Sequence, residues 1–228
     1  MNSEIRRRAS KNLLFQANWV WAKGLDDVGG TVQAALLDTQ NLGRDRANSD
    51  YVRRHAINAN FVYDLPLGRN RILGGWRLSG IWRRTTGRYL TPTFTSSGGL
   101  SNSRPDVVYG VSPNLPADHR SPDRWFNAGA FATVPAVDPA TGLPRFGNAG
   151  RNTIIWPGLN TVDANLAKVF PLAKERKTIT LRLEAFNLLN HANYGTPGLN
   201  ISNTSTVATI TNVLRPMRQV QFAVRFDF

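Results

Sequence analysis

The sequence has 228 residues, 41% of them hydrophobic, contains no cysteine, and carries a formal net charge of +13. The lack of cysteine excludes disulfide bridges and thiolate metal sites. The positive charge admits nucleic acid, an anionic membrane surface or acidic ligands as partners. We do not expect nucleic acid, because the arginines are scattered along the chain and are not gathered on one predicted helix or face.

Apolar residues recur at every second position in six segments, a period that predicts β-strands with one apolar and one polar face. In the first segment, Phe15, Trp19 and Trp21 share one face, while Gln16 and Asn18 occupy the other. Ahead of it, the sequence predicts the end of a preceding strand, which we call the N-terminal stub. The six predicted strands are residues 13–22, 55–65, 76–82, 160–170, 178–189 and 217–228.

The connections between these strands alternate in length. Residues 66–75 and 171–177 are short connections, whereas about 24–52, 91–159 and 190–216 are long ones. No run of about 18 apolar residues could form a membrane helix, but short turns on one side and long loops on the other are typical of a transmembrane barrel. Compact soluble domains rarely contain structureless loops of such length.

We therefore predict an all-β fold, an antiparallel transmembrane β-barrel segment of about six strands plus the N-terminal stub, with long external loops. The alternative is a soluble antiparallel sheet with one face on a core. If the short turns lie on the inner side of the membrane, Trp19 and Trp21 fall near the outer interface. Tyr63, Trp76 and Phe170 then fall near the inner interface, as two aromatic girdles require.

Several longer motifs occur along almost the whole chain. They include SDYVRRHAINANFVYDLP at 49–66, GGWRLSGIWRRTTGRYLTP at 74–92, PDRWFNAGAF at 122–131, LRLEAFNLLNHANYGTP at 181–197 and the final RQVQFAVRFDF. In content and order they resemble the C-terminal barrel portion of TonB-dependent outer-membrane receptors. The resemblance is to the acidobacterial-type group that carries an N-terminal carboxypeptidase-regulatory-like domain.

The resemblance implies that residues 1–228 form one unit, the C-terminal part of a receptor barrel in the outer membrane of a Gram-negative-type bacterium. Such a receptor takes up a bulky ligand. Its plug domain and the contact with its energy-coupling protein would lie in an upstream part, so we expect an incomplete barrel. Further expected partners are outer-membrane lipid, lipopolysaccharide and the barrel-assembly machinery. The assembly signal would consist of Val220, Phe222, Val224, Phe226 and Phe228.

The external loop at about 92–158 is the candidate ligand-binding surface, because it combines aromatic and cationic side chains. The candidates are Arg104, Arg120, Arg124, Trp125, Phe126, Phe131 and Arg151. The alternative for this loop is a folded cap that shields the barrel, with its arginines facing anionic lipopolysaccharide. A second hypothesis for the whole chain is a soluble β-rich binding module for a glycan or protein ligand. We predict no enzyme, cofactor or metal site, because the three histidines lie far apart and no catalytic motif is present.

Overall fold

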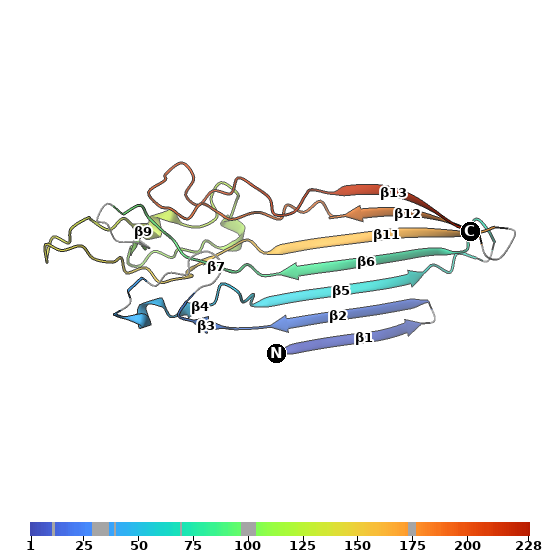
Figure 1. The fold of residues 1–228 in the computed structure, drawn as a ribbon, viewed down its shortest axis with the longest axis horizontal. Helices are drawn as coiled ribbons and strands as arrows, with labels where there is room; N and C mark the ends of the chain where they lie inside the picture. The colour runs from blue at the N-terminus through green and yellow to red at the C-terminus, as the bar shows by residue number, and fades with distance from the viewer. Residues whose placement is uncertain (11, 29–36, 39, 69, 97–103, 173–176) are drawn as a thin grey trace.

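The computed structural model is built around one seven-stranded antiparallel sheet (Figure 1). Its order is β1-β2-β5-β6-β11-β12-β13, so each long strand pairs with the next long strand along the chain. The strands lie side by side in one layer, with the long connections gathered beyond one end and the C-terminus at the other (Figure 1). The structure describes residues 1–10, 12–28, 37–38, 40–68, 70–96, 104–172 and 177–228.

All six predicted strands are present, and the N-terminal stub is a strand of nine residues. The seven strands are β1 (Asn2–Ser10), β2 (Leu13–Trp21), β5 (His55–Asp64), β6 (Trp76–Thr85), β11 (Leu159–Pro171), β12 (Thr178–Phe186) and β13 (Gln219–Asp227). In the described residues the sheet is open, since β1 and β13 each pair with one strand. The strand predicted at 178–189 ends earlier, at Phe186, because Asn187 adopts φ = 50°. Asparagine is one of the few residues that tolerate this left-handed conformation.

The apolar positions of all six predicted strands fall on one face of the sheet. One row crosses the sheet from Phe61 through Gly80, Ala164 and Ala185 to Val220. A Cβ at Gly80 would lie 2.7 Å from the Phe61 ring, so a glycine at this position leaves the space that the ring occupies. This apolar face is largely uncovered at β13, where Val220, Phe222 and Val224 are 60–65% exposed. A patch of this kind needs an apolar environment.

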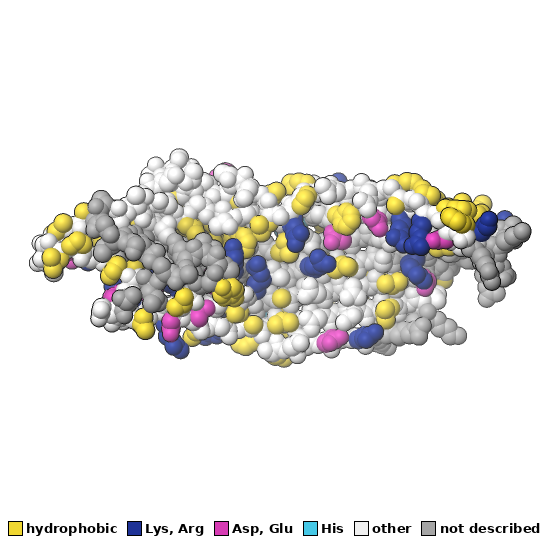
Figure 2. Space-filling view, in the orientation of Figure 1, with side chains coloured by type: hydrophobic (Ala, Val, Ile, Leu, Met, Phe, Trp, Pro, Cys, Tyr) yellow, Lys and Arg dark blue, Asp and Glu magenta, His cyan; other side chains and the backbone are white. Residues whose placement is uncertain are grey.

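The opposite face is polar, and its side chains bond to one another between strands. Gln16 donates to Glu4 at 2.9 Å, Arg77 pairs with Asp64 at 2.6 Å, and Gln221 donates to Glu184. Figure 2 shows charged side chains of both signs over the sheet, with hydrophobic side chains also visible between them. The two faces thus differ in chemistry over most of the sheet, with Arg84 and Lys168 as charged residues on the apolar face.

The three long connections fold into a body that we call the cap: the described residues between β2 and β5, between β6 and β11, and between β12 and β13. Its regular elements are short. They are β3 (Leu25–Asp26), η1 (Leu42–Asp45), β4 (Ala47–Asn48), β7 (Tyr89–Leu90), β8 (Asp106–Val107), η2 (Ala117–His119), η3 (Ala128–Ala130), β9 (Phe131–Ala132) and β10 (Ile154–Ile155). Strands β3 and β4, β7 and β10, and β8 and β9 form two-residue antiparallel pairs.

The hydrophobic core of the described residues lies in the cap and not on the sheet. It consists of Leu90, Phe126, Ala130, Phe131, Ala149, Ile154, Trp156 and Ala208. Backbone hydrogen bonds tie the last connection to this core, from Trp125 N to Ala208 O at 2.8 Å and from Ile210 N to Pro122 O at 2.7 Å. The connections are therefore packed on one another, as the folded-cap alternative requires.

Candidate functional site

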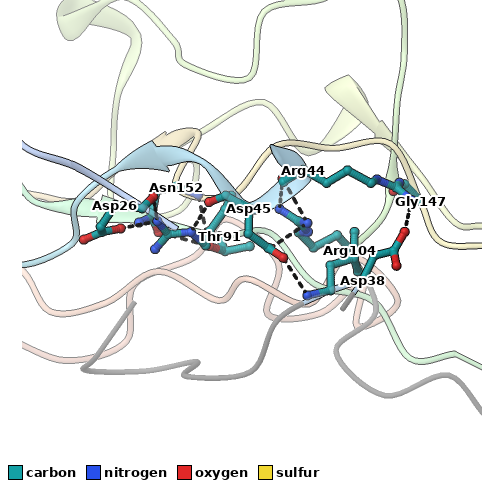
Figure 3. Close-up of polar contacts among 10 residues, drawn as sticks. Asp26, Asp38, Arg44, Asp45, Thr91, Arg104, Gly147 and Asn152 are labelled. Carbon is teal, nitrogen blue, oxygen red and sulfur yellow. Dashed lines mark hydrogen bonds and ion pairs between the residues drawn. The ribbon is translucent and has the colours of Figure 1, made fainter. Parts of the chain in front are cut away.

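Two buried arginines join the first long connection to the second (Figure 3). Arg104 pairs with Asp45 at 3.0 Å, and both side chains are at most 5% exposed. Arg151 pairs with Asp26 and also donates to Asp45 O at 2.8 Å. A buried charge is costly unless it is paired and hydrogen-bonded, so each arginine fixes the position of its partner loop.

Further hydrogen bonds extend this junction on either side. Asn152 donates to Asn48 O at 2.7 Å, and its backbone N–H donates to Thr91 Oγ1 at 3.0 Å. Arg44 donates to Gly147 O at 2.6 Å (Figure 3). The bonds of Asn152 to Asn48 and of Arg44 to Gly147 join residues 104 and 103 apart in two different connections, whereas the bond to Thr91 lies within one connection. The cap is therefore held by contacts both between and within its loops.

Two carboxyl groups of the cap have lowered pKa values. At Asp106, the hydrogen bond from Arg145 is the largest cause, opposed by burial and assisted by the backbone of Asn148. At Asp26, burial alone would raise the pKa, but hydrogen bonds from Ser49 and Arg151 together lower it. Both groups are therefore ionised at neutral pH.

We expect the cap to keep its packing from about pH 7 down to about pH 4 and to loosen below the ordinary aspartate pKa of 3.8. A carboxyl whose folded-state pKa is lowered stabilises the fold above its unfolded pKa and loses this contribution as the pH falls through the folded value. Hydrogen-exchange protection factors of cap amides against pH measure this. Protection that already falls between about pH 7 and pH 5 would contradict it. In the variant Asp106→Asn, the amides near β8 should no longer show the loss of hydrogen-exchange protection at low pH.

The structure places four of the seven candidate ligand-binding residues inside the cap. Phe126 and Phe131 are 1% and 7% exposed and pack edge to face with ring centroids 6.4 Å apart. Arg104 and Arg151 are occupied by the pairs described above. In this structure the four side chains are buried, the two rings in the cap core and the two arginines against carboxylates, so none of them faces a ligand, and neither arginine faces lipopolysaccharide. A direct ligand role for these four residues stays an untested prediction.

The other three candidates, Arg120, Arg124 and Trp125, are accessible. Arg124 is exposed, whereas Arg120 and Trp125 are half-buried. Arg120 Nε donates to Leu115 O at 2.8 Å, and its guanidinium carbon lies 5.8 Å from the centroid of the Trp125 ring. Trp125 Nε1 donates to Ile155 O at 2.8 Å. A ligand role for these three residues remains a prediction.

A cavity of about 470 Å³, which we call the outer cavity, lies where the cap meets the apolar face of the sheet. The register places three of its strand residues on that face: Ile57 pairs with Arg84 and Arg84 pairs with Asn160. The principal polar and aromatic side chains that line it are His55, Arg84, Arg120, Trp125, His191 and Tyr194. None of its described lining residues is acidic.

Two smaller cavities, which we call the inner cavities, lie near the outer cavity; the first is on the polar face and the second shares Trp156 and Leu159 with the outer cavity. One, of about 210 Å³, is lined by Arg83, Asp163 and Arg215; the other, of about 220 Å³, by Arg53, Trp156 and Arg215. Burial lowers the pKa of Arg53, and the neighbouring charge of Arg88 lowers it further. Sequence reasoning did not single out Arg53, Arg83, Arg84 or Arg215 as cavity residues. The available signal was the pair Arg83-Arg84 within a strand, since adjacent strand residues face opposite sides.

The five residues of the expected assembly signal lie on β13 and directly after it. They are exposed on the apolar face, and the rings of Phe226 and Phe228 stack with centroids 5.7 Å apart. Opposite them on β12, Val224 pairs with Leu181 and Phe222 with Leu183. Their part in assembly remains a prediction.

Neither a metal cluster nor a membrane helix is found among the described residues. No group of three or more histidine, cysteine, aspartate or glutamate side chains could hold a metal ion in the part of the chain that the structure describes. None of the helices there has the length and apolarity of a membrane span.

Comparison with known proteins gives one result. A family model described as an outer membrane beta barrel domain matches residues 1–221. Neither the curated proteins nor the solved structures contain a match.

Proposed function

The chain belongs to the outer membrane β-barrel family and lies in the outer membrane, and from this premise we propose that it serves as a segment of a receptor for TonB-dependent uptake of a bulky ligand. In this proposal the sheet forms part of the barrel wall, with its apolar face in lipid and its polar face lining the lumen. The cap forms the external surface that the ligand meets first. A soluble binding module is incompatible with location in the outer membrane.

The observation that carries the proposal is the cap itself. Three long connections pack into a single body with its own hydrophobic core at one end of the sheet. The inner cavities lie where this body meets the sheet and are lined by Arg53, Arg83 and Arg215, of which Arg83 lies on the polar face. A folded cap above a polar lumen is better suited to selective capture of a ligand than to free diffusion of solutes through an open pore.

Dependence on TonB rests on the motif resemblance, and the plug domain and the contact with the energy-coupling protein belong to the proposed upstream part. The apolar residues of β13 are the proposed point of contact with the barrel-assembly machinery. We propose no catalytic activity, since the polar side chains of the sheet bond to one another and those of the cap junction hold loops together.

Uptake can be tested in the bacterium that makes the protein. The parent strain, a strain without this gene and a strain without the energy-coupling protein are grown in one complex medium, and compounds left in it are measured by mass spectrometry. We expect at least one compound that only the parent depletes. If the strain without the coupling protein still depletes it, the protein is a passive channel. If removing the gene changes no compound, the uptake proposal is wrong.

A further inference from the structure

The outer cavity lies on the lipid side of the sheet, at the level of an aromatic girdle. Trp19, on the same face, stacks on the cavity residue His55 with ring centroids 5.9 Å apart and an interplanar angle of 6°. Trp82 lies beside the cavity and donates to Asn160 Oδ1 at 2.9 Å. Tryptophans on the lipid-facing side of a membrane protein mark the boundary between hydrocarbon and headgroups. The cavity, on the cap side of these rings, therefore lies at headgroup depth.

The chemistry of the lining is cationic and rich in hydrogen-bond donors. In the described residues, neither Arg84 nor Arg120 takes part in an ion pair. Arg120 uses its Nε on Leu115 O and keeps its terminal nitrogens for another acceptor. His55 Nδ1 accepts from Trp19 Nε1 at 3.3 Å, which places the proton of the neutral ring on Nε2 as a further donor. Such a set matches a phosphate group.

The direction from which an occupant can arrive follows from the sheet. The register places Arg83, in the inner cavity of about 210 Å³, on the polar side and Arg84 on the apolar side, and the paired strands β5, β6 and β11 separate these two side chains. A solute in the lumen would therefore meet Arg83 and not Arg84. An anionic group at headgroup level in the lipid phase lies on the side of the sheet that Arg84 faces.

We propose that the outer cavity binds the phosphorylated headgroup of an outer-leaflet glycolipid, with Arg84 and Arg120 as its cationic contacts and Trp125 and Tyr194 as its aromatic wall. At about 470 Å³ the cavity falls within the size range of ligand pockets. The bound headgroup would bridge β6 and the cap, and so hold the cap against the barrel wall. This inference depends on location in the outer membrane and not on the uptake proposal.

The chain supplies a matched control, because Arg83 and Arg84 are neighbours on opposite faces of β6. The protein is extracted from outer membranes in mild detergent as wild type, Arg84→Gln, Arg120→Gln and Arg83→Gln. Lipid A that remains bound after washing is quantified by mass spectrometry per protein. We expect at least a tenfold loss of bound glycolipid in Arg84→Gln and in Arg120→Gln, and wild-type retention in Arg83→Gln. Equal losses in all three variants, or no glycolipid on the wild type, would overturn the proposal.

A competition experiment separates the glycolipid from other phosphates. Washed wild-type protein is loaded with fluorescent lipopolysaccharide and challenged with phosphatidylglycerol vesicles, with inorganic phosphate or with unlabelled lipopolysaccharide. Only the unlabelled lipopolysaccharide should displace the probe. Displacement by phosphatidylglycerol or by phosphate at similar concentrations would show that the cavity takes any phosphate, and glycolipid recognition would be refuted. Unchanged heat-dependent gel mobility shows that each variant is folded.

Discussion

Replacing Arg104 with alanine should open the cap while the barrel wall stays intact. The change leaves Asp45, whose side chain is 3% exposed, as a buried carboxylate without its cation. Breaking a buried ion pair by removing one partner costs about 3–5 kcal/mol, which corresponds to a change of about a hundredfold or more in the opening equilibrium. The cost falls on the cap, because both residues lie there and local regions open independently of the global fold.

Hydrogen exchange of cap amides measures this opening, and exchange of amides in β5 and β6 serves as the internal reference. Arg124→Ala is the matched control, since Arg124 is an exposed cap arginine without an ion pair in the described residues. The double variant Asp45→Leu with Arg104→Met should regain part of the protection, because an apolar pair can replace a buried ion pair. Recovery is expected to be partial, since Asp45 also accepts from Leu37 N at 2.9 Å. Unchanged exchange in Arg104→Ala would show that the pair does not hold the cap.

A second large effect is expected for Phe222→Arg, on the lipid-facing side of β13. Phe222 lies near the middle of the strand, is 65% exposed and pairs with Leu183 on the apolar face. Arginine on the lipid face near the bilayer midplane costs about 2–4 kcal/mol. We therefore expect a several-fold or greater fall in the amount of folded protein in the outer membrane, measured by membrane fractionation and heat-dependent gel mobility.

The neighbouring substitution Gln221→Arg supplies the control for this experiment. Gln221 occupies the polar face of the same strand and bonds to Glu184, which an arginine in its place could pair with. We expect near-normal levels of this variant. Equal levels of the two variants would contradict the assignment of the apolar face to lipid and of the polar face to the lumen.

The strands and the chemistry of the two faces follow from the sequence alone. Alternation with a period of two is a local property, so Trp19, Phe61, Gly80 and Leu166 could be assigned to one face before any pairing was known. The structure pairs these faces strand by strand in register. The lengths of the connections likewise indicated which end of the sheet carries the large loops.

The contacts that hold the cap together could be found only in the tertiary structure. Arg104 and Asp45 are 59 residues apart and Arg151 and Asp26 are 125 apart, and no spacing rule connects them. In sequence, Arg104 and Arg151 look the same as the accessible Arg124, because burial of an arginine depends on which carboxylate folds against it. The outer cavity likewise needs β6 and the cap to meet, so Arg84 and Arg120 become neighbours only through tertiary packing. Local alternation fixes the faces of a strand, whereas contacts between distant loops arise from packing and charge pairing in three dimensions.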